Sequence, residues 1–216
     1  MSRLRFRISI SLDGFVAGPD QSVDNSLGIG SEMLHDWVIA LAAWRAPHGL
    51  PGGEVNESSK IVEEEQAGIG ATIMGRNMFG GHHGPWNAED PWNGWWGDDP
   101  PFHHPVFVLT HHARVPLELK GGTTFTFVTD GIESALDRAR ETAGGQDVAL
   151  AGGADVAQQY LRAGLVDEMD LHLVPILLGG GEWLFEGMGT DLHGLELVRT
   201  VPAAGVVHLK FARARS

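Results

Sequence analysis

The pattern that most constrains this fold is an alternation of apolar runs and helical segments in the second half of the chain. Residues 106–110 (VFVLT) and 147–151 (DVALA) are short, nearly continuous apolar runs, which are typical of strands buried on both faces. Between them, residues 132–143 repeat apolar side chains at helical spacing. Strands that alternate with helices predict an α/β fold with a mainly parallel sheet.

The segments on either side extend this pattern. Residues 4–10 alternate apolar and polar side chains and predict a half-buried strand, which Asp13 and Gly14 end in a turn. The other predicted elements are a helix over 31–44 capped by Ser31, a polar loop over 46–60, strands over 71–74 and 123–129, a helix after Gly153, a strand over 169–178 interrupted at Pro175, and an antiparallel pair over 195–201 and 206–212.

The composition narrows the classes of protein that this chain can belong to. A length of 216 residues suits one domain, predicted over residues 1–216, and 43% apolar residues suffice for a sizeable core. With 15 Lys and Arg against 28 Asp and Glu, the net charge of −13 argues against general binding to nucleic acid or anionic membranes. The sequence has no cysteine, which excludes disulfides, thiolate zinc sites and a cysteine nucleophile.

The location of the protein is also predicted from the sequence. Residues 1–14 alternate Arg with apolar side chains and lack the unbroken apolar run of a signal peptide. No apolar run approaches the roughly 20 residues of a membrane-spanning helix. We therefore expect a cytoplasmic protein that acts on a small molecule, with neither nucleic acid nor a membrane as a partner.

Ligands bind open α/β sheets beyond the carboxyl ends of the strands, so the segments that follow predicted strands are candidate sites. In VALAGGADVAQQYL (148–161), a buried strand runs into Gly152 and Gly153 and then a helix. The N–H groups and the positive dipole end of that helix favour an anion, and glycines let a phosphate approach the backbone. The same pattern also occurs as an ordinary tight connection, so phosphate binding is one of two interpretations.

Two further strand ends carry polar side chains. After the strand that ends at Gly75, Arg76 offers a guanidinium that suits a phosphate, although an isolated Arg is more often a surface ion-pair partner. VLTHHAR (108–114) places Thr110, two imidazoles and Arg114 after a second strand. Donors of this kind suit a ribose or a phosphate monoester.

These segments occur in an order that resembles a known superfamily. The chain contains, in sequence, SLDGFVAG (11–18), MGRNMF (74–79), VLTHHAR (108–114), AGGADVAQQYL (151–161) and GLVDEMDLHLVPILLGGGEWLF (164–185). Together they resemble the dihydrofolate reductase-like superfamily, in particular the group related to the reductase domain of the bifunctional riboflavin-biosynthesis deaminase/reductase. The resemblance covers residues 4–212.

The resemblance implies a single-domain α/β fold with a mainly parallel central sheet of about eight strands flanked by helices, and a C-terminal antiparallel hairpin. It implies an NADPH-dependent reductase that transfers hydride to a small heterocyclic, pterin- or pyrimidine-like substrate. A cis peptide bond between Gly152 and Gly153 and a homodimer through C-terminal strands are further implications. The implied cofactor-binding residues are Ala17, Gly75, Arg76, Asn77, Thr110, His111, His112, Ala151, Gly152, Gly153, Ala154 and Asp155.

The resemblance also assigns these residues to parts of the cofactor. Residues 152–153 and the start of the following helix would hold the pyrophosphate, and residues 76–77 would face the phosphates. Residues 110–112 would lie near the adenosine ribose and its 2′-phosphate, and Ala17 with its neighbours would lie against the nicotinamide.

The catalytic carboxylate is less clearly marked. In dihydrofolate reductases, a carboxylate in the first long helix holds the substrate and assists protonation. Glu32 is nearest to that position, and Asp36 follows one helical turn later on the same face. Both lie opposite the predicted apolar stripe, so an exposed surface role is the alternative. The deaminase half of the bifunctional enzymes needs a Cys-containing zinc motif, so we expect no deaminase activity.

Two other functions stay open from the sequence. The glycines and Arg76 would also serve an NADP(H)-binding sensor without turnover. A His-rich metal-binding protein is the other alternative, although adjacent histidines seldom bind one ion together and no regular metal-binding spacing occurs. The histidines concerned are His82, His83, His103, His104, His111 and His112.

The segment 82–104, HHGPWNAEDPWNGWWGDDPPFHH, has neither helical nor strand periodicity and forms most of an insertion loop predicted at 80–104. A loop this long in a compact domain is usually functional or disordered, and its tryptophans argue against disorder. We expect an ordered loop packed by its own tryptophans, with at least one aromatic ring near the cofactor or substrate. Anchoring of an insertion, or a dimer contact, is the alternative.

Overall fold

The computed structural model describes residues 2–81, 84–87, 89 and 92–214 of the chain. The strands are β1 Leu4–Ser11, β2 Phe15–Ala17, β3 Ile69–Gly75, β4 Pro105–Leu109, β5 Leu117–Glu118, β6 Thr124–Val128, β7 Asp147–Gly152, β8 Glu168–Val174, β9 Glu182–Trp183, β10 Leu195–Ala203 and β11 Val206–Arg213. The α-helices are α1 Asp36–Ile39, α2 Ala42–Arg45, α3 Glu57–Gln66, α4 Arg76–Phe79, α5 Ile132–Thr142 and α6 Ala154–Arg162, and short 3₁₀ helices cover Ser31–Leu34, Ala46–His48 and Lys120–Gly122.

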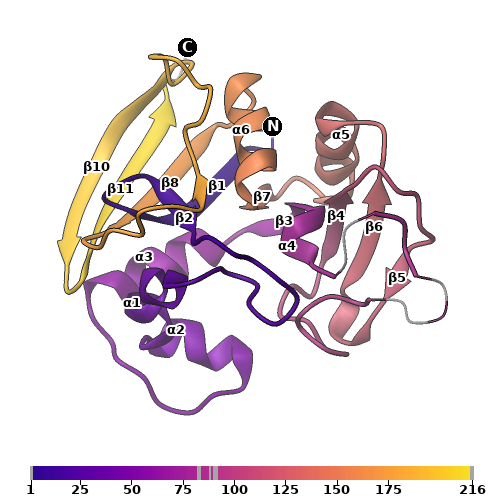
Figure 1. The fold of residues 1–216 in the computed structure, drawn as a ribbon, viewed down its shortest axis with the longest axis horizontal. Helices are drawn as coiled ribbons and strands as arrows, with labels where there is room; N and C mark the ends of the chain where they lie inside the picture. The colour runs from indigo at the N-terminus through magenta and orange to yellow at the C-terminus, as the bar shows by residue number, and fades with distance from the viewer. Residues whose placement is uncertain (1, 82–83, 88, 90–91, 215–216) are drawn as a thin grey trace. The chain divides into compact units, whose positions relative to one another are not determined.

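Within those residues, the main sheet has nine strands in the order β10-β11-β8-β1-β7-β3-β4-β6-β5, and β2 pairs with β9 separately (Figure 1). The pairs β1–β7, β7–β3, β3–β4 and β4–β6 are parallel. Strand β11 is antiparallel to β8 and to β10, and β5 is antiparallel to β6. The predicted α/β fold with a mainly parallel sheet and a C-terminal antiparallel pair is confirmed.

The chain is grouped into two compact units. Unit 1 comprises the N-terminal residues up to Phe6 together with Gly68–Val166, and unit 2 comprises Arg7–Ala67 together with the chain from Asp167 onward. The single domain predicted over residues 1–216 stays a prediction. Among the described helices, none has the length and apolar character needed to cross a membrane, and the cytoplasmic location stays a prediction as well.

In unit 1, helices α5 and α6 pack on strands β3 and β7, and α5 also packs on β4 (Figure 1). The predicted apolar side of α5 is buried, with Ala135, Leu136 and Ala139 at 0 to 2% exposure. Helix α6 buries Val156, Ala157, Tyr160 and Leu161, and the Tyr160 hydroxyl donates a hydrogen bond to the Ile132 carbonyl over 2.7 Å. This contact ties the two helices together.

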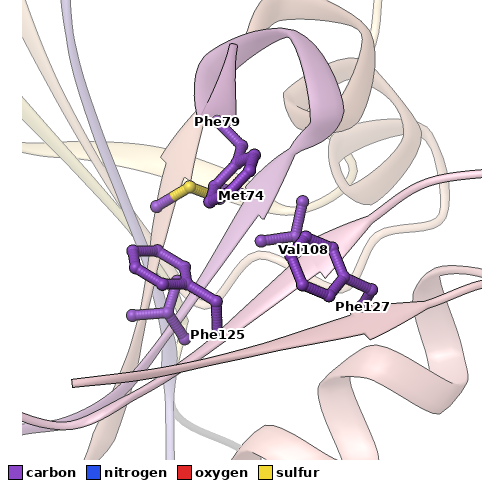
Figure 2. Packing of buried hydrophobic residues seen from close by; sticks show 6 residues of the cluster. Met74, Phe79, Val108, Phe125 and Phe127 are labelled. Atoms are coloured by element: carbon purple, nitrogen blue, oxygen red, sulfur yellow. The ribbon is translucent and has the colours of Figure 1, made fainter. Parts of the chain in front are cut away.

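An aromatic cluster connects the strands of unit 1 to the segment that follows β3 (Figure 2). The Phe79 ring, from α4, lies 5.1 Å from Phe125 and 5.4 Å from Phe127, and both pairs are edge-on. The strand side chains of the cluster alternate along β4 and β6, as expected for one face of a sheet. The buried members are Met74, Phe79, Val106, Val108, Phe125 and Phe127.

We expect Phe79→Ala to lower the free energy of unfolding by about 3–5 kcal/mol, because it removes a fully buried ring and leaves a cavity. Chemical denaturation followed by circular dichroism measures this change. The control is Val55→Ala, since Val55 is 82% exposed and should cost less than about 0.5 kcal/mol. Equal costs for the two variants would contradict the packing in Figure 2.

In unit 2, the predicted continuous helix over 31–44 is wrong. The segment forms a 3₁₀ turn, α1 and α2, and the residue that precedes the turn as its cap is Gly30. The Ser31 hydroxyl accepts a hydrogen bond from the Gly18 N–H, so it caps no helix. Leu41 is extended, and its neighbour Ala42 donates its N–H to the Glu54 carbonyl over 2.9 Å. These tertiary contacts override the local helical pattern.

The predicted polar loop over 46–60 is correct only in part, because α3 begins within it. Asn56 caps this helix: its side chain accepts from the Ser58 N–H over 2.9 Å, while the Ser59 hydroxyl accepts from the Asn56 N–H over 3.0 Å. The buried face of α3 is partly polar, which hides its helical period. Its buried residues are Ser58, Ser59, Ile61, Val62 and Glu65.

Candidate functional site

The carboxyl ends of three parallel strands meet at one edge of the sheet in unit 1. The register pairs Gly75 of β3 with Leu109 of β4, and Met74 of β3 with Gly152 of β7. The segments that leave this edge are residues 76–77, 110–112 and 153–155. Eleven of the twelve residues that the resemblance implied for the cofactor therefore lie in unit 1 at or just beyond this edge, and Ala17 lies in unit 2.

Gly75 is required where β3 meets the start of α6. A Cβ atom built on Gly75 would lie 2.8 Å from Cγ2 of Val156 and 3.6 Å from the N atom of Gly153. The first of these distances is shorter than real carbon contacts allow. A side chain at Gly75 would therefore push the start of α6 away from the strand.

Gly153 differs from Gly75 because the space beside it is open. A Cβ atom built on Gly153 would meet no atom of the described chain within 4 Å. Gly153 precedes the nine-residue helix α6, and no side chain of the described residues caps that helix end. A helix start whose N–H groups have no side-chain cap, with room beside it, is the arrangement that binds a phosphate.

The residues around this helix start fit the same interpretation. The peptide bond between Gly152 and Gly153 is cis, as the resemblance implied. Ala151 is half-buried in β7, and Ala154 is 4% exposed. Asp155 is exposed in the first turn of α6, where its carboxylate already interacts favourably with the helix dipole.

Arg76 is held by a tryptophan of the insertion loop. Its guanidinium carbon lies 3.8 Å from the centre of the Trp86 ring, and its side chain donates to the Gly80 carbonyl. Arg114 approaches the same ring at 5.0 Å and donates to the Trp92 carbonyl over 2.5 Å. Burial, and to a lesser extent the charge of Arg114, lowers the pKa of Arg76. Two guanidinium groups are thus fixed beside one indole at this edge.

Some polar groups of the segment that follows β4 are hydrogen-bonded to other groups of the protein. The Thr110 hydroxyl accepts from the His112 N–H over 3.2 Å, and the His112 carbonyl accepts from the Trp86 indole N–H over 2.7 Å. His111 is exposed, as is Asn77 at the start of α4. The imidazole of His111 and the amide of Asn77 are therefore accessible from solvent.

The insertion loop packs by its own tryptophans within the described residues 84–87, 89 and 92–104. The Trp92 and Trp95 rings lie 4.6 Å apart, and the Trp92 indole donates to the Phe79 carbonyl over 2.8 Å. Trp95 lies against Gly80, where a Cβ atom would be 2.3 Å from its indole nitrogen. Trp86 and Trp95 thus contact the segment that follows β3. The aromatic ring expected near the cofactor or substrate stays a prediction.

The His-rich metal hypothesis gains no geometric support. Among the described residues, no three His, Cys, Asp or Glu side chains form a group that could hold a metal ion. His104 Nε2 lies 2.7 Å from the Thr72 hydroxyl, and His103 Nδ1 lies 3.0 Å from the Gly121 carbonyl oxygen. His82 and His83 lie outside the described residues.

Unit 2 contains a pocket of about 440 Å³ that includes one of the two predicted catalytic carboxylates. Both carboxylates are on exposed residues, but Asp36 lines the pocket beside Trp37, whereas Glu32 is not part of its lining. The structure therefore separates two carboxylates that the sequence placed on one helical face. The lining residues are Met33, Asp36, Trp37, Ala40, Glu54, Asn56, Val174, Pro175, Ile176, Ala204 and Gly205.

Two motifs of the resemblance meet in unit 2. The Asp13 carboxylate of SLDG accepts from the N–H groups of Leu178 and Gly179 over 3.2 and 2.7 Å, and from the Ser11 hydroxyl over 2.5 Å. The Ser11 hydroxyl, followed by these backbone donors, lowers the pKa of Asp13. Ala17 lies in β2, where Gly181 approaches its carbonyl so closely that a Cβ atom would be 2.0 Å away. Asp13 therefore connects the two chain segments that make up unit 2.

The sheet order and the similar solved structures show a dihydrofolate reductase-like α/β fold. The chain belongs to the RibD C-terminal domain family, whose model matches residues 3–209. It is 31% identical over 86 residues to the uncharacterized protein YyaP of Bacillus subtilis, and 28% identical over 89 residues to YwjB of the same organism. These matches cover 39% and 41% of this chain, and about half of each relative's length, 45% and 50%.

Solved structures show the same fold. A protein described as a riboflavin biosynthesis protein from Shewanella sp. PV-4 has a TM-score of 0.61 at 20% identity, with both chains fully covered. The Thermotoga maritima diaminohydroxyphosphoribosylaminopyrimidine deaminase/5-amino-6-(5-phosphoribosylamino)uracil reductase has a TM-score of 0.59 at 13% identity, over 99% of this chain and 57% of that one. Enterococcus faecalis dihydrofolate reductase complexed with NADP(H) has a TM-score of 0.54 at 14% identity, over 99% and 97%.

We expect Gly75→Ala to lower the free energy of unfolding by about 1–3 kcal/mol, because the new methyl group overlaps Val156. The matched control is Gly180→Ala, since a Cβ atom on Gly180 meets nothing within 4 Å and its backbone conformation suits alanine. Denaturant unfolding measures both variants. A cost for Gly75→Ala no greater than that for Gly180→Ala would show that β3 and α6 are not in close contact.

Proposed function

We propose that this chain is an NADPH-dependent reductase that transfers hydride to a small heterocyclic substrate of the pterin or pyrimidine type. The observation that carries the proposal is the open, uncapped start of α6 at Gly153, in a member of the RibD C-terminal domain family. The similar solved structures include a uracil-derivative reductase and a dihydrofolate reductase complexed with NADP(H). Deaminase activity is not part of the proposal.

The strand edge of unit 1 suits the anionic part of this cofactor. The N–H groups that open α6 would hold the pyrophosphate, and Arg76 and Arg114 would supply positive charge. Local cations are needed because the chain as a whole carries a charge of −13. Trp86 holds both guanidinium groups before any ligand arrives, which reduces the entropy cost of binding.

NADPH supplies the hydride when it is bound, and the chain must supply the proton and the orientation of the substrate. The pocket of unit 2 has the groups for this role. Asp36 offers a carboxylate that can bind a ring N–H or amino group and hold a proton, and Trp37 offers an aromatic face beside it. Since Glu32 does not line the pocket, the proposal assigns the catalytic role to Asp36.

A homodimer through the C-terminal strands is a further part of the proposal. Strand β10 is at one end of the sheet order, and its Leu197 and Val198 are 54% and 57% exposed. An exposed edge strand with apolar side chains favours pairing with a second copy.

We expect Gly153→Ala to raise the dissociation constant for NADPH at least about tenfold, which corresponds to about 1.4 kcal/mol, because its methyl group enters the space for the pyrophosphate. The midpoint temperature of thermal unfolding should stay close to that of the wild type, since the methyl group meets no atom of the described chain within 4 Å. Fluorescence titration measures the affinity, and Gly180→Ala serves as the control. Wild-type protein without saturable binding up to about 1 mM NADPH would refute the cofactor assignment.

We expect Asp36→Asn to lower turnover about 100-fold, because the amide cannot hold the proton that the substrate needs. Glu32→Gln is the matched control and should stay within about twofold of wild type, since Glu32 is outside the pocket. The assay follows NADPH oxidation with pteridines, flavin precursors, quinones and carbonyl compounds. Binding of NADPH without oxidation across this panel would favour the sensor without turnover over the reductase.

A further inference from the structure

A chain of buried polar side chains crosses unit 2 beside the pocket. The β8–β11 register pairs His172 with His208 directly. Ser58 and Glu65 of α3 are seven positions apart, so they lie on the same helical face. They contact the two ends of this pair. The four members, Ser58, Glu65, His172 and His208, are each between 2% and 6% exposed.

Each of these four side chains contacts the next. Ser58 Oγ lies 2.9 Å from Nε2 of His208, and Nδ1 of His208 lies 2.9 Å from Nδ1 of His172. His172 Nε2 then lies 3.3 Å from Oε1 of Glu65. The first two distances are in the range of a hydrogen bond, whereas the third is an ion-pair distance, since Oε1 of Glu65 has no hydrogen-bond partner among the described residues.

Two facing Nδ1 atoms can share only one hydrogen, which limits the arrangements of the pair. In the neutral arrangement, Ser58 donates to His208, His208 donates through Nδ1 to His172, and the Nε2–H of His172 faces Glu65. In the charged arrangement with the added proton beside Glu65, His172 is an imidazolium that donates to His208, and His208 donates through Nε2 to Ser58. An added proton on His172 therefore reverses every hydrogen bond between His172 and Ser58, whereas an added proton on His208 would reverse only the bond to Ser58.

Neighbouring elements bring charges of both signs to the pair. Arg7 of β1 lies 3.9 Å from the Glu65 carboxylate, and Arg199 of β10 is paired with Glu64 at 2.7 Å. Lys210 of β11 is paired with two carboxylates of β8, Glu168 at 2.8 Å and Asp170 at 3.4 Å. The charged groups that face the imidazoles from neighbouring elements are thus Glu65, Arg7, Asp170, Arg199 and Lys210.

The electrostatic environment agrees with uptake of one proton. Burial, followed by the neighbouring His172 ring, lowers the pKa of His208 to about 4. Burial alone would raise the pKa of Glu65, but His172 and Arg7 hold it below its usual value. Glu65 therefore faces the pair as a carboxylate, which favours one positive charge on the pair.

The pair is in contact with the wall of the pocket. The Trp37 ring lies 4.7 Å from the His172 ring and 5.0 Å from the His208 ring, and its indole donates to the Ser9 hydroxyl over 3.1 Å. Asn56, which also lines the pocket, accepts the N–H of Ser58. His172 and Ser58, at the two ends of this set of hydrogen bonds, therefore each lie next to a residue that lines the pocket.

We propose that the His172–His208 pair is a one-proton switch that sets the position of Trp37 in the pocket wall. Trp37 is here a positioning residue, which acts on the pocket through its contacts with the two imidazoles. The positive charge beneath its ring strengthens the cation–π attraction in the protonated arrangement. Where the pocket is the substrate site of the function proposed above, the KM for the substrate changes with the same midpoint as the pair.

An NMR titration of the wild-type protein, without cofactor or substrate, tests the switch. It follows the histidine ring nitrogens and the tryptophan indole N–H groups between about pH 8 and about pH 4. We expect the two histidines to take up one proton between them, and the indole resonance of Trp37 to shift with the same midpoint. Trp37→Phe assigns that resonance. Because no ligand is used, the result does not depend on whether the protein is a reductase.

His208→Gln should abolish the shift of the Trp37 resonance, since the facing Nδ1 contact is lost. The matched control is His48→Gln, because exposed His48 stacks on Trp44 at 4.0 Å outside the buried chain. This control should change only the Trp44 resonance. Ser58→Ala, which removes the hydroxyl at one end, provides a second variant if His208→Gln does not fold.

A second readout is the pH dependence of stability. The unfolded chain titrates both histidines near a pKa of about 6.5, whereas the folded pair takes up at most one proton. Stability should therefore fall as the pH drops from about 6.5 to about 4, and His208→Gln should reduce the proton uptake on unfolding by about one. Independent titration of the two imidazoles, or a Trp37 resonance that does not follow their midpoint, would overturn the switch.

Discussion

The parallel register of β7, β3 and β4 is the constraint on which the candidate cofactor site depends. It pairs Gly75 with Leu109 and places Met74 opposite Gly152, so three chain segments leave the sheet at one edge. A slip of one residue would turn each strand's side chains to the other face and would disrupt the aromatic cluster around Phe79. The core therefore fixes the register, and the register brings together backbone and side chains that are far apart in the sequence.

Much of this arrangement could be predicted from the sequence, because buried parallel strands are continuous apolar runs and the ends of such strands share an edge. The prediction was wrong where tertiary contacts replace local ones. Ser31 has the chemistry of a helix cap, but its hydroxyl accepts from Gly18, and Leu41 is extended beside Glu54. Since both partners are distant in the sequence, periodicity alone predicts one helix where the structure has three short pieces.

The buried chain that includes His172 shows a second limit of prediction from sequence. Helix α3 buries Ser58, Ser59 and Glu65 beside only two apolar residues. A search for apolar residues at helical spacing therefore does not detect this helix. The partners of Ser58 and Glu65 come from β8 and β11, more than a hundred positions later in the chain. A polar side chain is buried at low cost only when its partner is present, and the sequence does not show which partner that is.

The insertion loop explains how this acidic chain keeps two cations at the strand edge. A guanidinium that is partly buried loses hydration, and its pKa falls, as it does for Arg76 and Arg114. Trp86 offsets that loss with its aromatic face, and the carbonyls of Gly80 and Trp92 accept from the two side chains. These two carbonyl acceptors carry no charge of their own, so they orient the guanidinium groups without neutralising them. Oriented guanidinium groups at this edge suit a planar anionic partner such as a phosphate.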